Sequence, residues 1–219
     1  ATNNGAKNLT LGGRLDVNSG IIGIGDRGTN GAQATNSIRM GSGTALSDNN
    51  KKQNAITIGA STNTDAGASG SHSIAIGSDA TAKSLNTLAI GRKAVASSDG
   101  ALVIGSPSSA RIAQAVGGNA LAIGSGAQAN GGIAIAIGEN ATAAKAWDIS
   151  IGRQAGSNQT TAQTEGRNIA IGDGALQNAK DPNNNIAMGT GAGDGLNGTA
   201  NVIIGTYANS KPHNSNTEI

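Results

Sequence analysis

The chain has 219 residues, a formal net charge of +2 and only two aromatic residues, Trp147 and Tyr207. Leu, Ile, Val and Phe together supply 38 residues, which is few enough to suggest disorder, but disordered chains of this composition usually carry a strong net charge. The chain contains no cysteine, and its basic residues form no run longer than the pairs Lys51-Lys52 and Arg92-Lys93. These features exclude disulfides and thiolate metal sites and argue against nucleic-acid binding.

A short apolar triplet that ends in glycine recurs thirteen times along the chain. Successive closing glycines are 13 to 20 residues apart, and the interval between Gly77 and Gly91 is 14 residues. Self-similarity at a short period is typical of solenoids, in which each coil buries its apolar side chains only when a neighbouring coil stacks on it. The closing glycines are Gly12, Gly25, Gly41, Gly59, Gly77, Gly91, Gly105, Gly124, Gly138, Gly152, Gly172, Gly189 and Gly205.

The first three units, within residues 1–60, are irregular. They read Leu9-Thr10-Leu11-Gly12, Ile22-Gly23-Ile24-Gly25 and Ile38-Arg39-Met40-Gly41. Arg39 places a charge at a position where most units carry alanine. We expect this end of the solenoid to be frayed or capped, or to be less tightly assembled than the rest.

Residues 61–205 contain the regular units. In the copy Ile74-Ala75-Ile76-Gly77, turn-forming residues follow the glycine, and then comes Ala80-Thr81-Ala82, a second run with a period of two. At about 3.3 Å per residue, such a coil holds two short strands and two turns. Glycine allows the chain to turn with positive φ. The asparagines that precede many triplets, such as Asn168 and Asn185, are expected to bond to local backbone or to one another in the stack.

The alternation within each triplet predicts two faces. The first and third residues are almost always Ile, Leu, Met or Val, and we expect them to fill the inside of the coil. The middle residue is small, where a solvated strand could carry almost any side chain. We therefore expect the middle residues to face a second copy of the chain, as a trimer interface. These predicted interface residues are Ala75, Ala89, Ala122, Ala136, Ser150, Ala170 and Ala187.

The units Asn36-Ser37-Ile38, Ser73–Ala80 and Asn119–Ala127 resemble the repeat of YadA-like head domains in trimeric autotransporter adhesins. The resemblance covers nearly the whole chain, because the triplet, the minimum spacing and the trailing alanines agree across many copies. It implies an all-β fold, a left-handed parallel β-roll solenoid of about 13 short coils, assembled as a side-by-side homotrimer. It also implies an adhesive head at the tip of a stalk, exposed on the outer membrane of a Gram-negative bacterial cell.

On this interpretation, residues 1–219 form a single head domain, with irregular coils in 1–60, regular coils in 61–205 and a tail in 206–219. No heptads for a stalk follow Gly205, and no segment approaches the roughly 18 consecutive apolar residues of a membrane helix. We therefore expect the neck, stalk and membrane anchor to lie outside this chain, so that only an absent anchor domain would contact a membrane.

Six residues are candidate ligand contacts. Trp147 would be a natural binding anchor if it were exposed, and otherwise it packs over its own coil. The basic residues in turns of the central coils could form a stripe that attracts acidic partners, although separate solvated charges explain them equally well. These basic residues are Arg92, Lys93, Arg111, Lys145 and Arg153. No Asp or Glu lies at ligand spacing around His72 or His213, so we expect no metal site and no cofactor.

The resemblance implies binding to a host extracellular-matrix protein, such as collagen, fibronectin or laminin, or to a host cell receptor. Immunoglobulin binding and self-association between bacteria remain alternatives. An enzyme is disfavoured, because left-handed acyltransferase helices rely on a catalytic histidine, whereas His72 lies in a turn without a partner for general-base chemistry. An ice-binding protein is disfavoured because threonine occupies the middle of the triplet only at Thr10 and Thr57.

Overall fold

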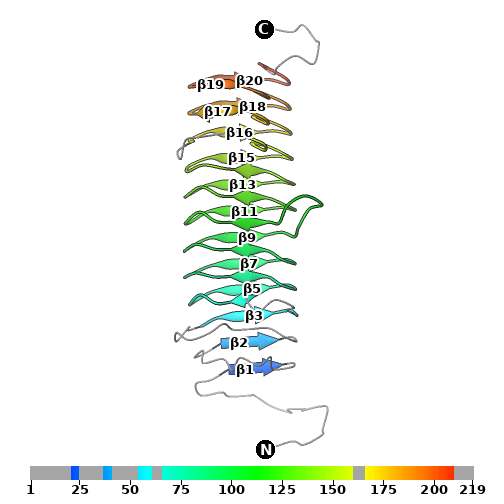
Figure 1. The fold of residues 1–219 in the computed structure, drawn as a ribbon, viewed down its shortest axis with the longest axis vertical. Coiled ribbons are helices and arrows are strands. Elements are labelled where there is room, and N and C mark those ends of the chain that lie inside the picture. Colours follow the sequence, from blue (N-terminus) through cyan, green and yellow to red (C-terminus); the bar gives the residue numbers. More distant parts are fainter. Residues whose placement is uncertain (1–20, 25–36, 41–53, 61–65, 160–165, 210–219) are drawn as a thin grey trace, which may run out of the picture.

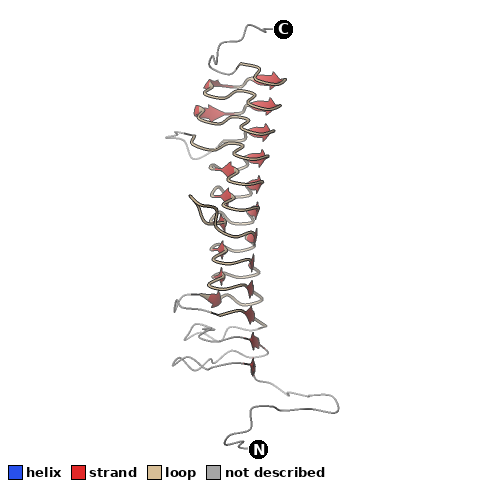
Figure 2. Ribbon diagram, turned by 90° about the vertical axis from the view of Figure 1, so that its right-hand side faces the viewer, coloured by secondary structure: helices blue, strands red, loops and turns tan. Residues whose placement is uncertain are grey.

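The computed structural model describes residues 21–24, 37–40, 54–60, 66–159 and 166–209. Over these residues the chain is an elongated solenoid of β-strands and turns without a helix (Figure 1). Figure 2 shows two rows of strands that run side by side along the axis. The paired strands of successive coils are parallel. The parallel β-solenoid of short coils predicted from the sequence is confirmed.

One wall of the solenoid is a 12-stranded sheet, in which each strand pairs with the equivalent strand of the next coil. The triplets stack in register, so that Ala75 lies opposite Ala89, and Ala122 lies opposite Ala136. Twelve of the thirteen triplets form these strands, and the first triplet lies outside the described residues. The strands are β1 (Ile21–Ile24), β2 (Ser37–Met40), β3 (Ile56–Ile58), β5 (Ile74–Ile76), β7 (Leu88–Ile90), β9 (Leu102–Ile104), β11 (Leu121–Ile123), β13 (Ile135–Ile137), β15 (Ile149–Ile151), β16 (Ile169–Ile171), β18 (Ile186–Met188) and β20 (Val202–Ile204).

The opposite wall is a 6-stranded sheet of two-residue strands, which follow the closing glycines from Gly59 to Gly138. The second strand predicted in the regular units is confirmed in these six units. Its strands are β4 (Gly67–Ala68), β6 (Thr81–Ala82), β8 (Val95–Ala96), β10 (Gln114–Ala115), β12 (Gln128–Ala129) and β14 (Thr142–Ala143). In the last coils, β17 (Lys180–Asn183) and β19 (Asn197–Thr199) form a separate two-stranded sheet.

The interior between the two walls is built from alanine. Ala82 reaches it from the smaller sheet and Ala89 from the 12-stranded sheet, while Ala80 and Ala101 reach it from the turns that precede β6 and β9. Each of these side chains is at most 2% exposed. Protein interiors are packed without voids, so a coil lined with methyl groups must be thin.

The orientation predicted for the triplets is wrong. In β5, β7, β11 and β13 the middle residue is buried and its two neighbours are half-exposed. The small middle residues therefore point into the coil, and the large aliphatic residues point outward. The physical reason is volume, because the narrow gap between the two walls has room for a methyl group but not for a row of isoleucine side chains. Alanine lines both walls, whereas the predicted orientation would have placed isoleucine on one wall and alanine on the other.

The closing glycines are required by conformation and by space. Nine of them have φ between +123° and +145°, a region that only glycine adopts readily. A Cβ atom on Gly77 would also lie 2.6 Å from the backbone carbonyl of Gly91 in the next coil. Positive φ is confirmed at nine of the ten closing glycines that the structure describes, and the exception is Gly105, which precedes the long loop Ser106–Ile112. Gly12, Gly25 and Gly41 lie outside the described residues. The nine glycines are Gly59, Gly77, Gly91, Gly124, Gly138, Gly152, Gly172, Gly189 and Gly205.

The asparagines before the triplets have two different roles. Those that precede a triplet by two residues adopt left-handed backbone with φ of 54° to 57°, as at Asn54, Asn86 and Asn119. Those immediately before a triplet form a ladder along the axis. The Nδ2 of Asn201 donates to Oδ1 of Asn185 at 2.9 Å, and the Nδ2 of Asn185 donates to Oδ1 of Asn168 at 3.3 Å. The hydrogen bonds predicted between stacked asparagines are confirmed for this ladder.

Candidate binding surfaces

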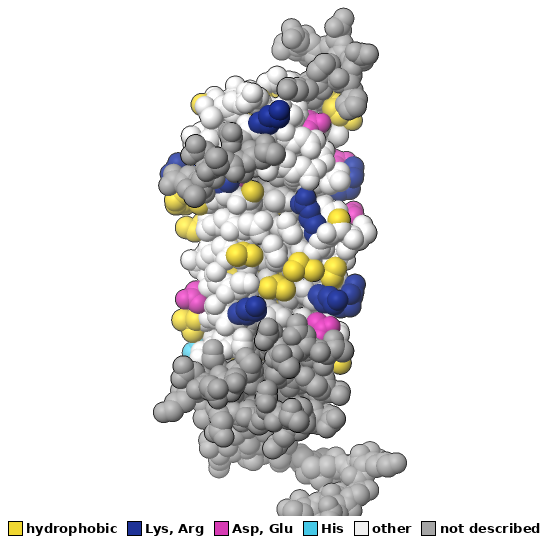
Figure 3. Space-filling view, viewed as in Figure 1, with side chains coloured by type: hydrophobic (Ala, Val, Ile, Leu, Met, Phe, Trp, Pro, Cys, Tyr) yellow, Lys and Arg dark blue, Asp and Glu magenta, His cyan; other side chains and the backbone are white. Residues whose placement is uncertain are grey.

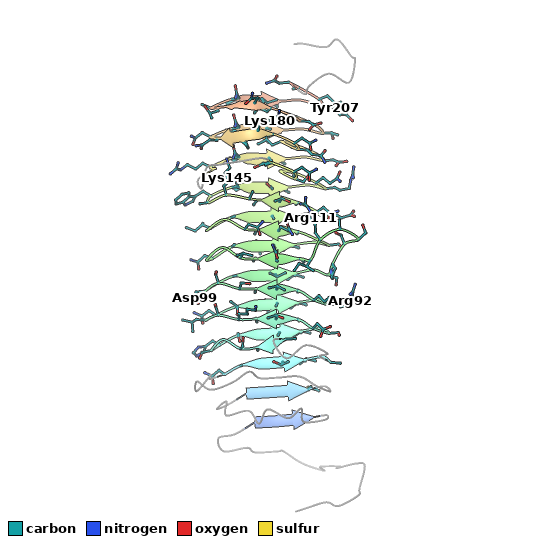
Figure 4. All side chains as sticks on the ribbon, viewed as in Figure 1. Arg92, Asp99, Arg111, Lys145, Lys180 and Tyr207 are labelled. Atoms are coloured by element: carbon teal, nitrogen blue, oxygen red, sulfur yellow. The ribbon has the colours of Figure 1, made fainter. Side chains whose placement is uncertain are left out.

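The solenoid offers three surfaces to partners. The isoleucine face is the outward surface of the 12-stranded sheet. The glycine edge consists of the turns that follow its strands, such as Gly77–Ala80. The far edge consists of the turns that precede its strands, such as Ser84–Thr87. In Figure 4, Arg92 marks the glycine edge on the right and Asp99 marks the far edge on the left.

The seven residues predicted to form a trimer interface lie inside their own coil. Each is at most 2% exposed in a single chain, so no second chain can contact these side chains. The prediction is wrong because alternation in a strand shows that two faces differ without showing which face is inward. The residues that this corrects are Ala75, Ala89, Ala122, Ala136, Ser150, Ala170 and Ala187.

The isoleucine face carries two rows of aliphatic side chains. The first and third residues of the triplets are half-exposed through most of the described coils, as at Ile135 and Ile137. Ile104 and Met188 are each 40% exposed. The rows therefore form a long apolar stripe parallel to the solenoid axis.

The glycine edge carries three of the predicted basic contacts. Arg92 and Lys93 are adjacent and exposed. Arg153 is also exposed, and its Nη2 lies 2.7 Å from Oδ2 of Asp173 in the next coil. Glu139 is an exposed residue on the same edge, in the coil before that of Arg153. Figure 3 shows Lys and Arg side chains in separate places, several with Asp or Glu close by. The structure does not gather the basic residues into one continuous stripe.

Arg111 extends from the loop Ser106–Ile112 along the solenoid axis. Its Nη1 donates to Oγ1 of Thr142 at 2.7 Å, and its Nη2 donates to Oδ1 of Asn158 at 3.0 Å. In the same loop, Oγ of Ser108 donates to Oδ1 of Asn140 at 2.6 Å. These partners are 31 to 47 residues away in sequence, so only the stacking of coils brings them together. Arg111 fastens the loop to later coils.

Lys145 is buried, so the prediction that it contacts a ligand at the surface is wrong. Its Nζ donates to the backbone oxygen of Pro182 at 2.7 Å, a partner 37 residues further along the chain. Its backbone N–H donates to Oδ2 of the buried Asp148 at 3.1 Å. The other carboxylate oxygen of Asp148 accepts two hydrogen bonds from Asn168, at 2.9 and 3.0 Å. Burial raises the pKa of Asp148, although these hydrogen bonds and the charge of Lys145 oppose the rise. This polar cluster forms the base of the asparagine ladder.

Trp147 is exposed at the far edge. Its side chain is 44% exposed, and the guanidinium carbon of Arg167 lies 4.9 Å from the centre of the ring. Of the two positions considered from the sequence, the exposed one is observed. Ile133, in the coil before Trp147, was not singled out by sequence reasoning, yet it is 55% exposed.

The described residues show neither a metal-binding cluster nor a membrane-spanning helix. No group of three or more His, Cys, Asp and Glu side chains there could hold a metal ion. None of the described segments is a helix that could span a bilayer.

The repeating coil is also found by comparison with protein families. A two-copy model of the YadA head domain repeat matches residues 52–80, 68–94 and 82–106. Residues 52–106 are therefore similar to YadA head repeats. In the structure this segment contains the strands from β3 to β9, and the 12-stranded sheet that it belongs to continues through β20. A comparison with curated proteins finds no match. The YadA head family and the solenoid fold suggest a structural and adhesive role on a bacterial cell surface.

Proposed function

We propose that this chain is the adhesive head of a trimeric autotransporter adhesin on the outer surface of a Gram-negative bacterium. There it binds a host extracellular-matrix protein or a host cell receptor. The observation that carries the proposal is the match of residues 52–106 to the YadA head repeat. It is supported by the continuation of the 12-stranded sheet of stacked triplets from this segment through β20 (Val202–Ile204).

The isoleucine face supports assembly with further copies of the same chain. Soluble monomers rarely leave an apolar surface of this length open to water. Its rows repeat at the spacing between neighbouring strands, about 4.8 Å, and another copy of this solenoid has the same repeat. A copy aligned side by side can therefore cover the stripe along its whole length. That three chains assemble is an inference from the family.

A trimer presents every turn three times. Three copies of a weak site on one rigid rod raise the effective concentration of each site for the next, which strengthens attachment without new contacts. On the glycine edge, Arg92, Lys93 and Arg153 would attract acidic groups of the ligand. Arg111 and Trp147 complete the set of proposed contacts, and Lys145 is excluded because it is buried.

A binding screen tests the proposed function. The purified head is applied to immobilised collagen, fibronectin and laminin, and to epithelial cells, over a range of salt concentrations. We expect saturable binding to at least one of them. Binding that weakens as salt rises would assign a share of the attraction to the basic residues. Absence of saturable binding to every surface would contradict an adhesive role for this head.

A pair of charge-matched variants locates the basic contacts. Arg92→Gln with Lys93→Gln removes two positive charges from the glycine edge. Lys83→Gln with Lys180→Gln removes two exposed positive charges from other positions. We expect the first variant to bind more weakly and the second to bind like the parent. Equal losses of binding in the two variants would indicate that binding depends on the total charge of the head and not on the position of the basic residues.

A further inference from the structure

A lysine and an asparagine from neighbouring coils meet in a buried site. Lys145 lies between β14 and β15, Asn168 lies immediately before β16, and each residue is 2% exposed. The Nζ of Lys145 donates to the backbone oxygen of Pro182 at 2.7 Å, and the Nδ2 of Asn168 donates to the same oxygen at 3.1 Å. The amine and the side-chain amide are therefore held side by side, out of contact with solvent.

The stacking of coils fixes this arrangement. The strands β15, β16 and β18 pair in register, so the residues immediately before them follow one another along the axis. These residues are Asp148, Asn168 and Asn185. Each is at most 2% exposed, and hydrogen bonds join each side chain to the next. Groups that a protein holds in one geometry react far faster than the same groups free in solution.

Burial favours the reactive form of the Lys145 amine. A charged ammonium group is costly away from water, so desolvation favours the neutral amine. The neutral amine is the form of lysine that attacks a carbonyl carbon, and burial is one of the ways in which proteins activate it. The carboxyl group of the neighbouring Asp148 can take the proton that the amine gives up.

Two donors polarise the side-chain carbonyl of Asn168. Its Oδ1 accepts hydrogen bonds from the backbone N–H of Asn185 at 3.1 Å and from the Nδ2 of Asn185 at 3.3 Å. N–H groups aimed at a carbonyl oxygen stabilise the negative charge that develops there when a nucleophile attacks the carbon. Asn185 thus supplies an oxyanion hole to the Asn168 amide.

Asp148 contacts the nitrogen that would leave. Its Oδ1 accepts a hydrogen bond from the Nδ2 of Asn168 at 3.0 Å. Burial raises the pKa of the Asp148 carboxyl, although its hydrogen bonds and the charge of Lys145 oppose the rise. A carboxyl group that holds a proton beside an amide nitrogen can act as the general acid for its departure.

We propose that Lys145 and Asn168 join in an isopeptide bond that links two successive coils. The Nζ of Lys145 bonds to the Cγ of Asn168, the bond from this Cγ to Nδ2 breaks, and Nδ2 leaves as ammonia. Asp148 gives one proton to Nδ2 and recovers one from Nζ, so it is unchanged at the end and no further reagent is consumed.

The bond would benefit the fold in two ways. It converts a buried amine into a neutral amide, which removes the cost of burying a charge at Lys145. It also gives a chain without cysteine a covalent staple between coils, which restricts the unfolded chain as a disulfide does. This inference is independent of the proposed adhesive function.

Mass spectrometry of the denatured parent tests the inference. The linked chain is lighter than its sequence by one ammonia molecule. Trypsin cuts between the two linked residues, after Arg153 and Arg167, and would separate them if no isopeptide bond were present. We expect a branched product that connects residues 112–153 to residues 168–180, with no cleavage at Lys145.

Two results for the parent would overturn the inference. One is a folded chain of full mass that yields separate peptides 112–145 and 168–180. The other is an ammonia loss that maps to a succinimide at an asparagine while trypsin still cuts at Lys145. The parent decides the question by itself, whether or not any variant folds.

Single variants assign the roles. Lys145→Arg keeps the positive charge but removes the amine nucleophile, and Asp148→Asn keeps the size of the side chain but removes the acid. We expect both variants to have the full mass of their sequences and to yield no branched product. Lys83→Arg changes an exposed lysine of an earlier coil and is the matched control, which should form the bond as the parent does. A branched product that persists in either variant of the site would overturn the inference.

Discussion

At the scale of single residues, position relative to the closing glycine decides what each side chain does. Residues 133–137 read as an unbroken alternation of isoleucine and alanine, and nothing in that pattern separates Ile133 from Ile135. The register set by Gly138 places Ile135 in β13 and leaves Ile133 in a turn with positive φ. Lys145 reads as a solvated turn residue because Pro182, the partner of its Nζ, is remote in sequence. The contact of Lys145 with a later coil was therefore beyond sequence reasoning.

Asp148 is expected to make the free energy of unfolding depend on pH. Burial raises its pKa above the ordinary 3.8, so the folded protein binds this proton more readily than the unfolded chain. Its contribution to stability is complete below pH 3.8 and is lost as the pH rises through the raised pKa. Between pH 3.8 and the raised pKa of Asp148, we expect the free energy of unfolding of the parent to fall relative to that of Asp148→Asn.

Urea unfolding of both proteins at closely spaced pH values checks this expectation. Other acidic groups titrate in both proteins, so the difference isolates Asp148. A difference that rises with pH, or that does not change, would mean that the hydrogen bonds from Asn168 and Lys145 outweigh burial.

At the scale of elements, the repeat itself made most of the fold predictable. The triplets, the closing glycines and the Ala-x-Ala runs correctly indicated two short strands per coil and a turn with positive φ. The inward face of the triplet could not be obtained from periodicity, because a period of two is symmetric between the faces. Side-chain volume resolves it, since the narrow gap between the walls is filled mainly by small side chains, as at Ala122 and Ala136.

The glycine turns provide a prediction for the stacking of coils. Gly124 has φ of +128°, and a Cβ atom there would lie 2.6 Å from the backbone oxygen of Gly138. We expect Gly124→Ala to lower the free energy of unfolding by at least about 2 kcal/mol, because both backbone strain and a backbone clash arise. Denaturant titration measures the change.

Gly132→Ala is the matched control. A Cβ atom on Gly132 would meet no atom within 4 Å, and its φ is not positive. This substitution should leave stability within about 1 kcal/mol of the parent, in the direction of greater stability. Equal effects of the two substitutions would show that the close approach of successive turns does not matter.

At the scale of the whole molecule, the described part of the chain is a thin rod with a core mainly of alanine and an aliphatic outer face. Large aliphatic side chains point outward from β5 to β18, where one chain leaves them half-exposed. Such a rod is a poor monomer, because its interior consists of small side chains while its larger apolar surface faces water. Assembly through the isoleucine face removes that mismatch.

Sedimentation equilibrium of the parent and of one double variant decides whether the chains assemble through the isoleucine face. We expect the parent to sediment as three chains of 21.2 kDa each. Ile135→Asp with Ile137→Asp should abolish the trimer, because two carboxylates would enter the proposed interface. Gln128→Asp on the smaller sheet should leave it intact. A stable, folded monomer of the parent chain, or a trimer that survives both aspartates on the isoleucine face, would contradict the account.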